Sequence, residues 1–348
     1  MDSITHGLSG MLLGRVLHKT QQPAGLTLRA RFLVGFLCAI FPDIDFVMRA
    51  GGMLTYLNTH RGVTHSILLA PIWAWLLAWL FAWLWRGRYS WRAFYLLCLL
   101  SILAHIIGDL ITAYGTMLFA PLSNGKLSWS TTFIIDLYFT AIIALTLIVA
   151  AMTKRHGRQI AIAGALLLIS YIGFQGFLQH AAVRLAYDRI AQQQLRHATA
   201  EAIPQPLSPF NWKLIISDQD SYQVAYVNLW REEVITVTAD ANWLGKLNAL
   251  YAPKRALVWQ AIPRFGGDEP QQALSKHIWQ SEAMRDIRGF MLYPSTFFAN
   301  DSGCAWFVDQ RFVLSNMRQP FVFGGCQEEV NAIIRLYRWD EAGKQLIQ

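Results

Sequence analysis

Charged residues are scarce in this chain, and their scarcity excludes an ordinary soluble protein. Lys, Arg, Asp and Glu make up 15% of the 348 residues, and 54% of the residues are apolar, whereas soluble domains average about 25% charged residues. The apolar excess is concentrated between residues 32 and 180. There is no internal repeat and no low-complexity run, and residues 1–20 lack a basic start followed by a small-residue cleavage site. We therefore expect a membrane protein without a cleavable signal peptide.

Sequence motifs of several other chemistries are also missing. The chain has no Ser-x-Gly elbow, no phosphate-binding glycine loop and no redox Cys-x-x-Cys where such a motif would carry its chemistry. Cysteine is rare, with four residues. Cys38 and Cys98 lie in apolar segments, where they are expected to pack as small apolar residues. Cys304 and Cys326 lie in the polar C-terminal part, where an oxidising compartment would permit a disulfide; the sequence leaves that pairing open.

What the chain does have is a series of apolar segments. Residues 66–85 contain no charged residue, and twenty residues are about the length of a helix that crosses the hydrocarbon core. The other predicted helices cover residues 4–17, 32–48, 93–113, 133–153 and 159–180. The first of them is only moderately apolar, so whether it spans fully is left open. These segments predict an α-helical membrane domain of about five or six helices over residues 1–184.

The sequence after residue 184 has a soluble composition. Residues 186–202 predict a polar helix, and Pro204, Pro206 and Pro209 end it, so residues 185–209 are expected to form a helical, proline-containing linker. Short runs rich in β-branched and aromatic residues then predict strands at 212–216, 222–230, 234–238, 256–261, 305–314 and 333–339. One helix is expected around residues 271–288. Residues 210–348 therefore predict a small β-rich (α+β) soluble domain.

The basic residues are grouped in the loops between the apolar segments. They are Lys19, Arg29 and Arg31, then Arg86, Arg88 and Arg92, and then Lys154, Arg155 and Arg158. The positive-inside rule places these three loops in the cytoplasm. Membrane topology therefore accounts for the net charge of +8, and no nucleic-acid partner is expected. The same topology predicts that the domain after residue 185 is extracytoplasmic.

Four short polar clusters and one further carboxylate interrupt the apolar region. They are Asp2 with His6, Asp43 with Asp45, His60 with His65, His105 with Asp109, and Asp136. Imidazole and carboxylate are the groups that hold divalent metals such as zinc, and ionisable groups in apolar segments are functional candidates by default. The topology above places every cluster at the outer side. We therefore expect these nine residues to supply a metal site.

Several of these residues also have a simpler interpretation. Asp2 could serve only the positive end of a helix dipole, and Asp136 could cap its helix. Arg61 could contact lipid headgroups at the membrane edge. The stripe of Trp75, Trp79 and Trp83 is explained by interface anchoring and helix packing.

The motifs taken together resemble a known family. They are Asp2-Ser-Ile-Thr-His6 with Gly10 and Gly14, Phe41-Pro-Asp-Ile-Asp45, His60-Arg-Gly-Val-Thr-His65-Ser66, His105-Ile-Ile-Gly-Asp109, Tyr114-Gly-Thr116, Pro121-Leu-Ser123 and Ile134-Ile-Asp136. Over roughly residues 1–150 they are similar to the YdjM-like inner-membrane-bound, metal-dependent hydrolases. That family is similar in turn to the zinc phospholipase C and single-strand nuclease superfamily.

The resemblance implies a ligand set. It contains His6, one of Asp43 and Asp45, one of His60 and His65, and His105 with Asp109. The chain lacks an obvious second helix with the His-x3-Glu pair that completes the zinc cluster of the soluble enzymes. One or two zinc ions are therefore expected, with Asp136 as a substitute carboxylate.

The expected function is a membrane-embedded metal-dependent hydrolase of the bacterial inner (cytoplasmic) membrane, multi-pass, with a periplasmic C-terminal domain. Asp43 or Asp45 would act as general base, and Arg61 would clamp a phosphate or carboxylate. The bilayer is the expected partner, and the substrate would be a phosphoester or other ester of a lipid or envelope component at the outer face. Two alternatives stay open: a His/Asp-lined transporter or proton relay, and a non-catalytic scaffold with an outer binding domain.

Overall fold

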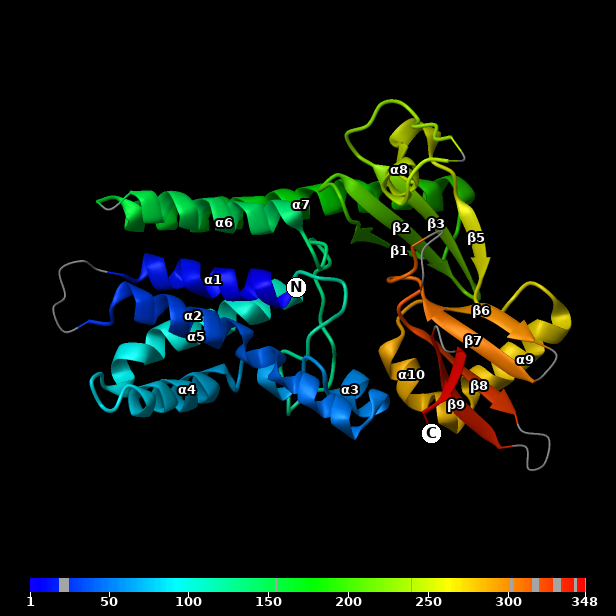
Figure 1. Ribbon diagram of the computed structural model, residues 1–348. Coiled ribbons are helices and arrows are strands. Elements are labelled where there is room, and N and C mark those ends of the chain that lie inside the picture. The colour runs from blue at the N-terminus through cyan, green and yellow to red at the C-terminus, as the bar shows by residue number, and fades with distance from the viewer. Residues whose placement is uncertain are drawn as a thin grey trace. The chain divides into compact units, whose positions relative to one another are not determined.

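The computed structural model describes residues 1–18, 25–153, 155–238, 240–300, 303–314, 319–327, 333–340 and 343–347 (Figure 1). Lys19 and Lys154, two of the basic loop residues, lie outside this set. The chain forms two compact units. The first contains residues 1–48, 59–177 and 206–209, and the second contains Arg49–Asn58, Leu178–Gln205 and Phe210–Gln348.

The first unit is helical. Its helices are α1 (Ser3–Val16), α2 (Leu28–Ile40), η2 (Val63–His65), α4 (Ala70–Leu84), α5 (Trp91–Leu110), α6 (Leu137–Met152) and the first part of α7 (Gly157–Gln193). The 3-10 helix η1 (Phe41–Gly51) follows α2, and the short α3 (Met53–Thr59) follows η1. The α-helical hydrogen bonding of α2 ends just before Pro42, which has no N–H to donate. The prediction of a helical domain followed by a β-rich domain is confirmed.

Two glycines let α1 and α2 approach closely. A Cβ atom built on Gly10 would lie 2.0 Å from the Gly35 carbonyl oxygen, and one built on Gly35 would lie 2.2 Å from the Gly10 carbonyl oxygen. Each glycine therefore leaves space that the other backbone fills. This contact fixes the N-terminal helix against α2, and it holds the start of α1 near the end of α5.

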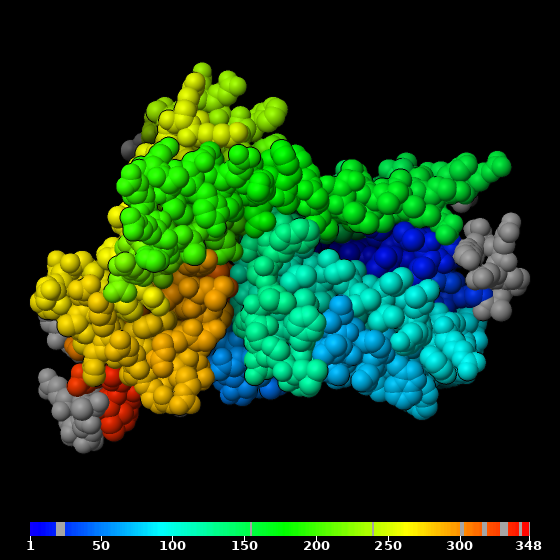
Figure 2. Space-filling view, turned by 180° about the vertical axis from the view of Figure 1, so that it is seen from behind, coloured from blue at the N-terminus to red at the C-terminus, as the bar shows by residue number. Residues whose placement is uncertain are grey.

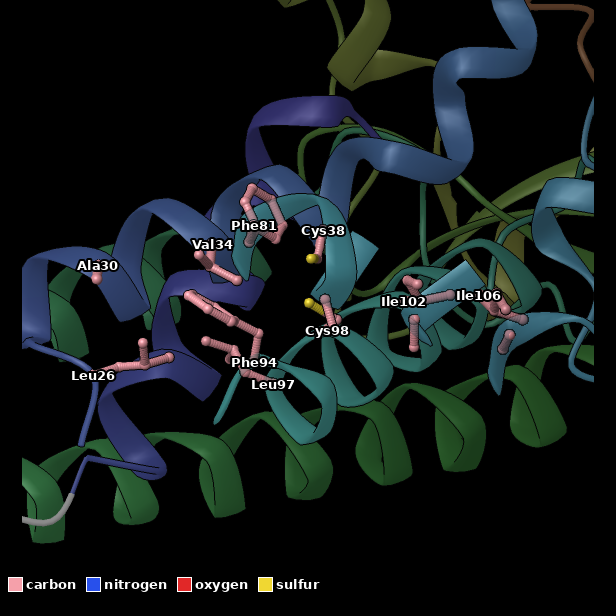
Figure 3. Packing of buried hydrophobic residues seen from close by; sticks show 13 residues of the cluster. Leu26, Ala30, Val34, Cys38, Phe81, Phe94, Leu97, Cys98, Ile102 and Ile106 are labelled. Atoms are coloured by element: carbon pink, nitrogen blue, oxygen red, sulfur yellow. The ribbon is translucent and has the colours of Figure 1, made fainter. Parts of the chain in front are cut away.

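The core of this unit lies between α2, α4 and α5 (Figure 3). Val34, Phe94 and Ile102 are fully buried in it. Cys38 and Cys98 are also buried, with their sulfur atoms directed toward one another across the α2–α5 contact. Their place among apolar side chains agrees with the role expected of them.

Two helices of the described chain are long and apolar enough to cross a membrane, namely α5 and α7. The segment from Met53 to His65 together with α4 passes the same test, with a bend of 78° between the two parts. The predicted span at residues 66–85 is therefore shorter than expected, because the chain turns at residues 66–69 and α4 begins at Ala70 with Pro71 in its first turn. The helix α6 is apolar and has 16 residues.

The second unit contains two antiparallel-rich sheets. In the first, β1 (Thr199–Pro204), β2 (Asn211–Asp218), β3 (Ser221–Asn228) and β4 (Ala252–Pro253) lie in that order, and β5 (Gln260–Pro263) also pairs with β3. The second has the order β10 (Gly343–Leu346), β9 (Ile334–Asp340), β8 (Val322–Gln327), β7 (Cys304–Asp309) and β6 (Pro294–Asn300). Its helices are α8 (Trp243–Ala249), α9 (Glu269–Gln280) and α10 (Arg285–Phe290), with 3-10 turns η3 (Lys254–Ala256) and η4 (Glu282–Met284). The first sheet packs on Leu178, Ala182 and Ala186 of α7.

The linker region differs from the prediction. The helix α7 continues to Gln193, and residues 199–204 form strand β1 instead of the end of a polar helix. Thr199 pairs with Ser217 and Pro204 with Trp212. The mixed composition of residues 199–204 gives no strand signal, and the strand forms by pairing with β2.

Two strand predictions also need correction. Residues 234–238 were expected to form a strand, but they have no regular structure and are exposed, in the segment that leads to α8 (yellow-green in Figure 2). Of the strand expected at 256–261, only the end forms, as β5 from Gln260. The expected helix near 271–288 is present as α9 and α10. Cys304 and Cys326 face each other across β7 and β8 and form a disulfide.

Candidate metal centre

Four side chains bring their ligand atoms together at one end of the helical unit. Asp43 comes from η1, His65 from the end of η2, and His105 and Asp109 lie one turn apart on α5. Their ligand atoms all lie within 4.8 Å of one another. His65, His105 and Asp109 are buried, whereas the side chain of Asp43 is 26% exposed. The group is therefore closed on three sides and open at Asp43.

The spacing of these atoms matches a single ion. His65 Nε2 lies 3.0 Å from His105 Nε2 and 3.2 Å from Asp109 Oδ2. His105 Nε2 lies 3.5 Å from Asp109 Oδ2 and 3.6 Å from Asp43 Oδ1, and the His65 Nε2 to Asp43 Oδ1 distance is 3.8 Å. Four ligands at zinc distance in a tetrahedron would be about 3.3–3.4 Å apart. The four atoms are thus arranged as the corners of one coordination site.

The contacts of Nδ1 in His65 and His105 bear on whether Nε2 of each ring carries a hydrogen. His105 Nδ1 lies 2.6 Å from the Ala39 carbonyl oxygen, which can only accept, so Nδ1 carries the hydrogen. His65 Nδ1 lies 3.0 Å from Thr64 Oγ1, which can donate or accept, and 3.5 Å from Asp45 Oδ2, which accepts. With the hydrogen of His65 also on Nδ1, both Nε2 lone pairs point toward each other and toward Asp109. A cation between them would satisfy all three groups.

Asp109 is the most heavily contacted of the four. Its Oδ1 accepts a hydrogen bond from the Met1 amino group and lies 3.2 Å from His6 Nε2. In Figure 1 the N-terminus accordingly lies beside the end of α5. Its Oδ2 is buried, lies 2.9 Å from Arg61 Nε and accepts no well-aligned hydrogen bond from the described residues. This oxygen also faces His65 and His105, so the residues present are compatible with a divalent cation.

His6 lies next to the group without joining it. Its ring stacks on that of His105 with centroids 3.7 Å apart. The neighbouring Gly108 makes room for it, because a Cβ atom there would lie 3.0 Å from His6 Cε1. His6 therefore supports His105 and Asp109 from the α1 side.

Asp45 and His60 form a second pair beside the four ligands. His60 Nδ1 lies 2.9 Å from Asp45 Oδ1, and the Arg61 backbone N–H donates to Asp45 Oδ2 at 2.9 Å. Asp45 also lies near His65 Nδ1, as described above. A carboxylate in this position orients an imidazole and raises its basicity. The two aspartates of the Phe-Pro-Asp-Ile-Asp motif thus have different surroundings: Asp43 faces the ligand group, and Asp45 faces the imidazole Nδ1 atoms.

Arg61 is buried and directed at Asp109. Its Nε lies 2.9 Å from Asp109 Oδ2, and its Nη1 donates to the Asp109 carbonyl and to Thr112 Oγ1 at 3.2 and 2.9 Å. Its guanidinium lies 4.9 Å from the centre of the Tyr114 ring. With 3% exposure it does not lie among headgroups. Its backbone has φ of 60°, a conformation that costs about 1–3 kcal/mol in a non-glycine residue.

Asp2 and Asp136 lie outside the four-residue group. Asp2 accepts hydrogen bonds from the backbone N–H and the hydroxyl of Thr5 at 3.0 and 2.7 Å, which caps α1. Asp136 caps α6 through the Phe139 N–H at 2.9 Å and accepts a bond from the Tyr171 hydroxyl at 2.9 Å. Both carboxylates therefore serve helix N-termini. The contacts of Thr112 and Tyr114 with Arg61 were not foreseen, although Tyr114 stands in one of the quoted motifs.

The comparison with known families agrees with this fold. The model of the YdjM inner membrane protein family matches residues 1–182. The chain belongs to the YdjM inner membrane protein family. The match covers α1 to α6 and the first part of α7, and it ends within the stretch of α7 that packs on the first sheet. With its apolar helices, this family membership makes the chain a membrane protein.

One curated relative extends the comparison. The uncharacterized protein YfhP of Bacillus subtilis (strain 168) is 23% identical over 227 residues, which cover 64% of this chain and 67% of the relative. No solved structure matches. Within this YdjM family member, the buried Asp-His-His-Asp group is compatible with metal binding.

Proposed function

We propose that this YdjM family member is a membrane-embedded, zinc-dependent hydrolase that cleaves a phosphoester or other ester bond of a lipid or envelope substrate. The observation that carries the proposal is the pair of imidazole Nε2 atoms 3.0 Å apart, each with its Nδ1 beside an oxygen, next to a buried carboxylate oxygen. With both ring hydrogens on Nδ1, the two imidazoles present acceptors to each other and to this oxygen, and a cation between them would satisfy all three. The donor set of two imidazoles and two carboxylates suits zinc among the common divalent ions.

Asp43, His65, His105 and Asp109 would hold the ion. Zinc in such a site supplies water activation near neutral pH and polarises the scissile ester or phosphoryl oxygen. Asp43 is the ligand on the open side, so the substrate would approach past it. Arg61 and the Met1 amino group would hold Asp109 in place, because both contact its carboxylate.

The Asp45–His60 pair is the proposed proton carrier. His60 Nδ1 contacts the Asp45 carboxylate at 2.9 Å. The His60 side chain is 15% exposed, whereas those of His65 and His105 are fully buried. An imidazole oriented in this way is suited to general acid–base work. This assignment gives Asp45 an orienting role and replaces the direct general base expected from the sequence.

The surroundings of Asp43 favour an amphiphilic substrate. Ser3 Oγ donates to Asp43 Oδ2 at 3.0 Å, so the start of α1 meets η1 beside the opening. The residues that follow these two in the chain, Ile4 and Ile44, are 69% and 49% exposed. A lipid ester would place its polar group at the ligands and its chains on these apolar side chains. The basic loops support a topology in which this end of the helices and the β-rich unit are extracytoplasmic.

Elemental analysis tests the proposal. Detergent-purified wild type is expected to carry zinc or a similar divalent ion, and His105→Ala and Asp109→Ala are expected to lose it. His277→Ala is the control, because His277 is exposed on α9 in the second unit. A hydrolysis screen with phosphodiesters and lipids would accompany it. Metal at wild-type stoichiometry in both ligand variants would contradict the ligand set, and a metal-loaded protein inactive on every ester would contradict the hydrolase.

A further inference from the structure

A second site lies on the surface of the α4–α5 hairpin. It is a groove of about 760 Å³. Its lining consists of Pro71, Ile72, Trp75, Trp91, Arg92 and Tyr95. Nothing in the metal centre uses these residues. His105 and Asp109 lie 13 and 17 positions after Arg92, so they are roughly 20–25 Å further along α5.

The groove is charged at one end and lined by apolar and aromatic side chains along the rest of its length. Arg92 is the one charged residue among the six that line it, and it stands in the first turn of α5. Pro71 and Ile72 stand in the first turn of α4. Because the two helices form a hairpin (Figure 1), these ends are separated by most of the length of α4, about 20 Å. The groove is therefore polar at one end only.

A membrane phospholipid has the same asymmetry. The hydrocarbon core is about 30 Å thick, so the acyl chains of one leaflet extend about half of that distance. The apolar part of the groove is long enough for such a chain. A guanidinium binds phosphate with two parallel hydrogen bonds, and Arg92 is exposed at the end where a headgroup would lie. Arg86 and Arg88 in the adjoining turn add positive potential, which favours an anionic lipid.

The tryptophans of α4 separate groove residues from other surface residues. Trp75, Trp79 and Trp83 are 46%, 59% and 68% exposed, so the stripe faces outward and does not serve helix packing. Trp75 lines the groove, and Trp79 and Trp83 do not belong to its lining. Trp91 forms the wall beside Arg92, with the guanidinium 5.5 Å from its ring centre. Trp83 is thus a matched control for Trp75 on the same face.

The geometry points to a specific binding site for one anionic phospholipid of the surrounding bilayer. Its phosphate binds Arg92, and one acyl chain lies along Tyr95, Trp75 and Ile72. The bound lipid is a structural ligand at the predicted cytoplasmic side, and it is not the substrate of the metal centre. The inference holds whether or not the chain is a hydrolase.

Native mass spectrometry of the full-length protein in mild detergent tests this site. Wild type would be titrated with phosphatidylglycerol and, separately, with phosphatidylcholine. We expect one tightly held lipid and a preference for phosphatidylglycerol. Arg92→Gln should weaken phosphatidylglycerol binding about tenfold, as expected for loss of a charge-assisted hydrogen bond, and should remove the preference. Trp75→Ala should weaken the binding of both lipids.

The controls distinguish this site from general attraction. Arg92→Lys should keep the preference for phosphatidylglycerol, Arg88→Gln should weaken phosphatidylglycerol binding much less than Arg92→Gln does, and Trp83→Ala should bind as wild type. Equal losses in Arg88→Gln and Arg92→Gln would mean a diffuse basic surface and overturn the proposal. Binding of no lipid, or a dimer mass that excludes lipid, would overturn it as well. Size-exclusion chromatography checks folding. If Arg92→Lys elutes as wild type and Arg92→Gln gives no monodisperse peak, the weaker lipid binding of Arg92→Gln reflects misfolding, and this result would count against a lipid site.

Discussion

His65 and His105 face each other through their Nε2 atoms at 3.0 Å, although they come from different helices and lie 40 positions apart in the chain. Each ring is fixed from behind, His105 by the Ala39 carbonyl and His65 by Thr64 and Asp45. Under the proposed function, these supporting contacts would orient the two rings toward a shared ion.

Asp45→Asn tests these supporting contacts. The variant keeps the shape of the side chain and removes the charge that orients His60 and faces His65 Nδ1. We expect metal affinity to fall about 10–100-fold, the usual effect of losing such a partner. Metal-buffer titration of purified protein measures it. Asp268→Asn, at an exposed position, is the control, and equal affinities in the two variants would contradict the orienting role.

Arg61→Met tests the ion pair with Asp109. Both groups are nearly fully buried, and removal of one partner of a buried pair costs about 3–5 kcal/mol. A large fall in the thermal unfolding midpoint in detergent is therefore expected. Arg285→Met removes an exposed pair with Glu282, for which about 0–1 kcal/mol is typical. Similar midpoints for the two variants would show that Arg61 is not the partner that holds Asp109.

The sequence predicted which residues lie near the candidate metal centre, but it did not predict the position of each within the centre. The i, i+4 spacing of His105 and Asp109 predicts a shared helix face, and both residues reach the ligand group. Asp43 and Asp45 could not be distinguished, because their directions depend on the 3-10 turn after Pro42. His65 joins the ligands and His60 does not, since Arg61 adopts a left-handed conformation between them. Backbone conformations of this kind leave no periodic pattern of apolar residues in the sequence from which they could be predicted.

The same limit applies to the second unit. Strands with alternating or continuous apolar residues were predicted, such as the one at 212–216 that lies within β2, and so was the helix near α9. Strand β1 was not, because residues 199–204 have a mixed composition and owe their structure to β2. The apolar run at 234–238 has strand composition, but it pairs with no described strand. Strand pairing is a long-range property, and local propensity is a weak guide to it.

Gly10→Ala tests the close contact between α1 and α2. The added methyl would meet the Gly35 carbonyl at 2.0 Å, so the helices must separate and the start of α1 must shift away from Asp109. Overpacking of this kind costs about 1–3 kcal/mol, and metal content should fall with the thermal midpoint. Gly173→Ala is the control, because no atom lies within 4 Å of its added methyl. A wild-type midpoint for Gly10→Ala would contradict the contact.

Reporter fusions test the topology inferred from the basic loops. Alkaline phosphatase fused after residue 90 is expected to be inactive, because the turn between α4 and α5 is predicted to be cytoplasmic. Fusions after residue 120 and after residue 195, between α7 and β1, are expected to be active. Fluorescent-protein fusions at the same positions should give the opposite pattern. The reverse result in both series would place the metal centre on the cytoplasmic side.

Lys213 makes the stability of the second unit depend on pH. Its side chain is fully buried, and its amino group donates to the Gln310 and Val313 carbonyls at 2.6 and 2.9 Å and to Gln310 Oε1 at 3.2 Å. Burial lowers the pKa of this amino group from 10.5 to about 7, against the attraction of Asp309. Between these values the unfolded chain binds the proton and the folded chain does not. Stability should therefore rise with pH in this window, by up to about 1.4 kcal/mol per pH unit.

Thermal unfolding of wild type and Lys213→Met between pH 7.5 and 9.5 measures this dependence. Methionine fills a similar space and does not titrate, so the difference between the two proteins isolates the lysine from all other groups. The midpoint of wild type should increase with pH relative to that of the variant. Lys276→Met is the control, because Lys276 pairs with Asp220 at 3.1 Å with both side chains exposed. Parallel curves for wild type and Lys213→Met would mean that the three oxygen acceptors keep Lys213 charged throughout, and that its pKa is not lowered.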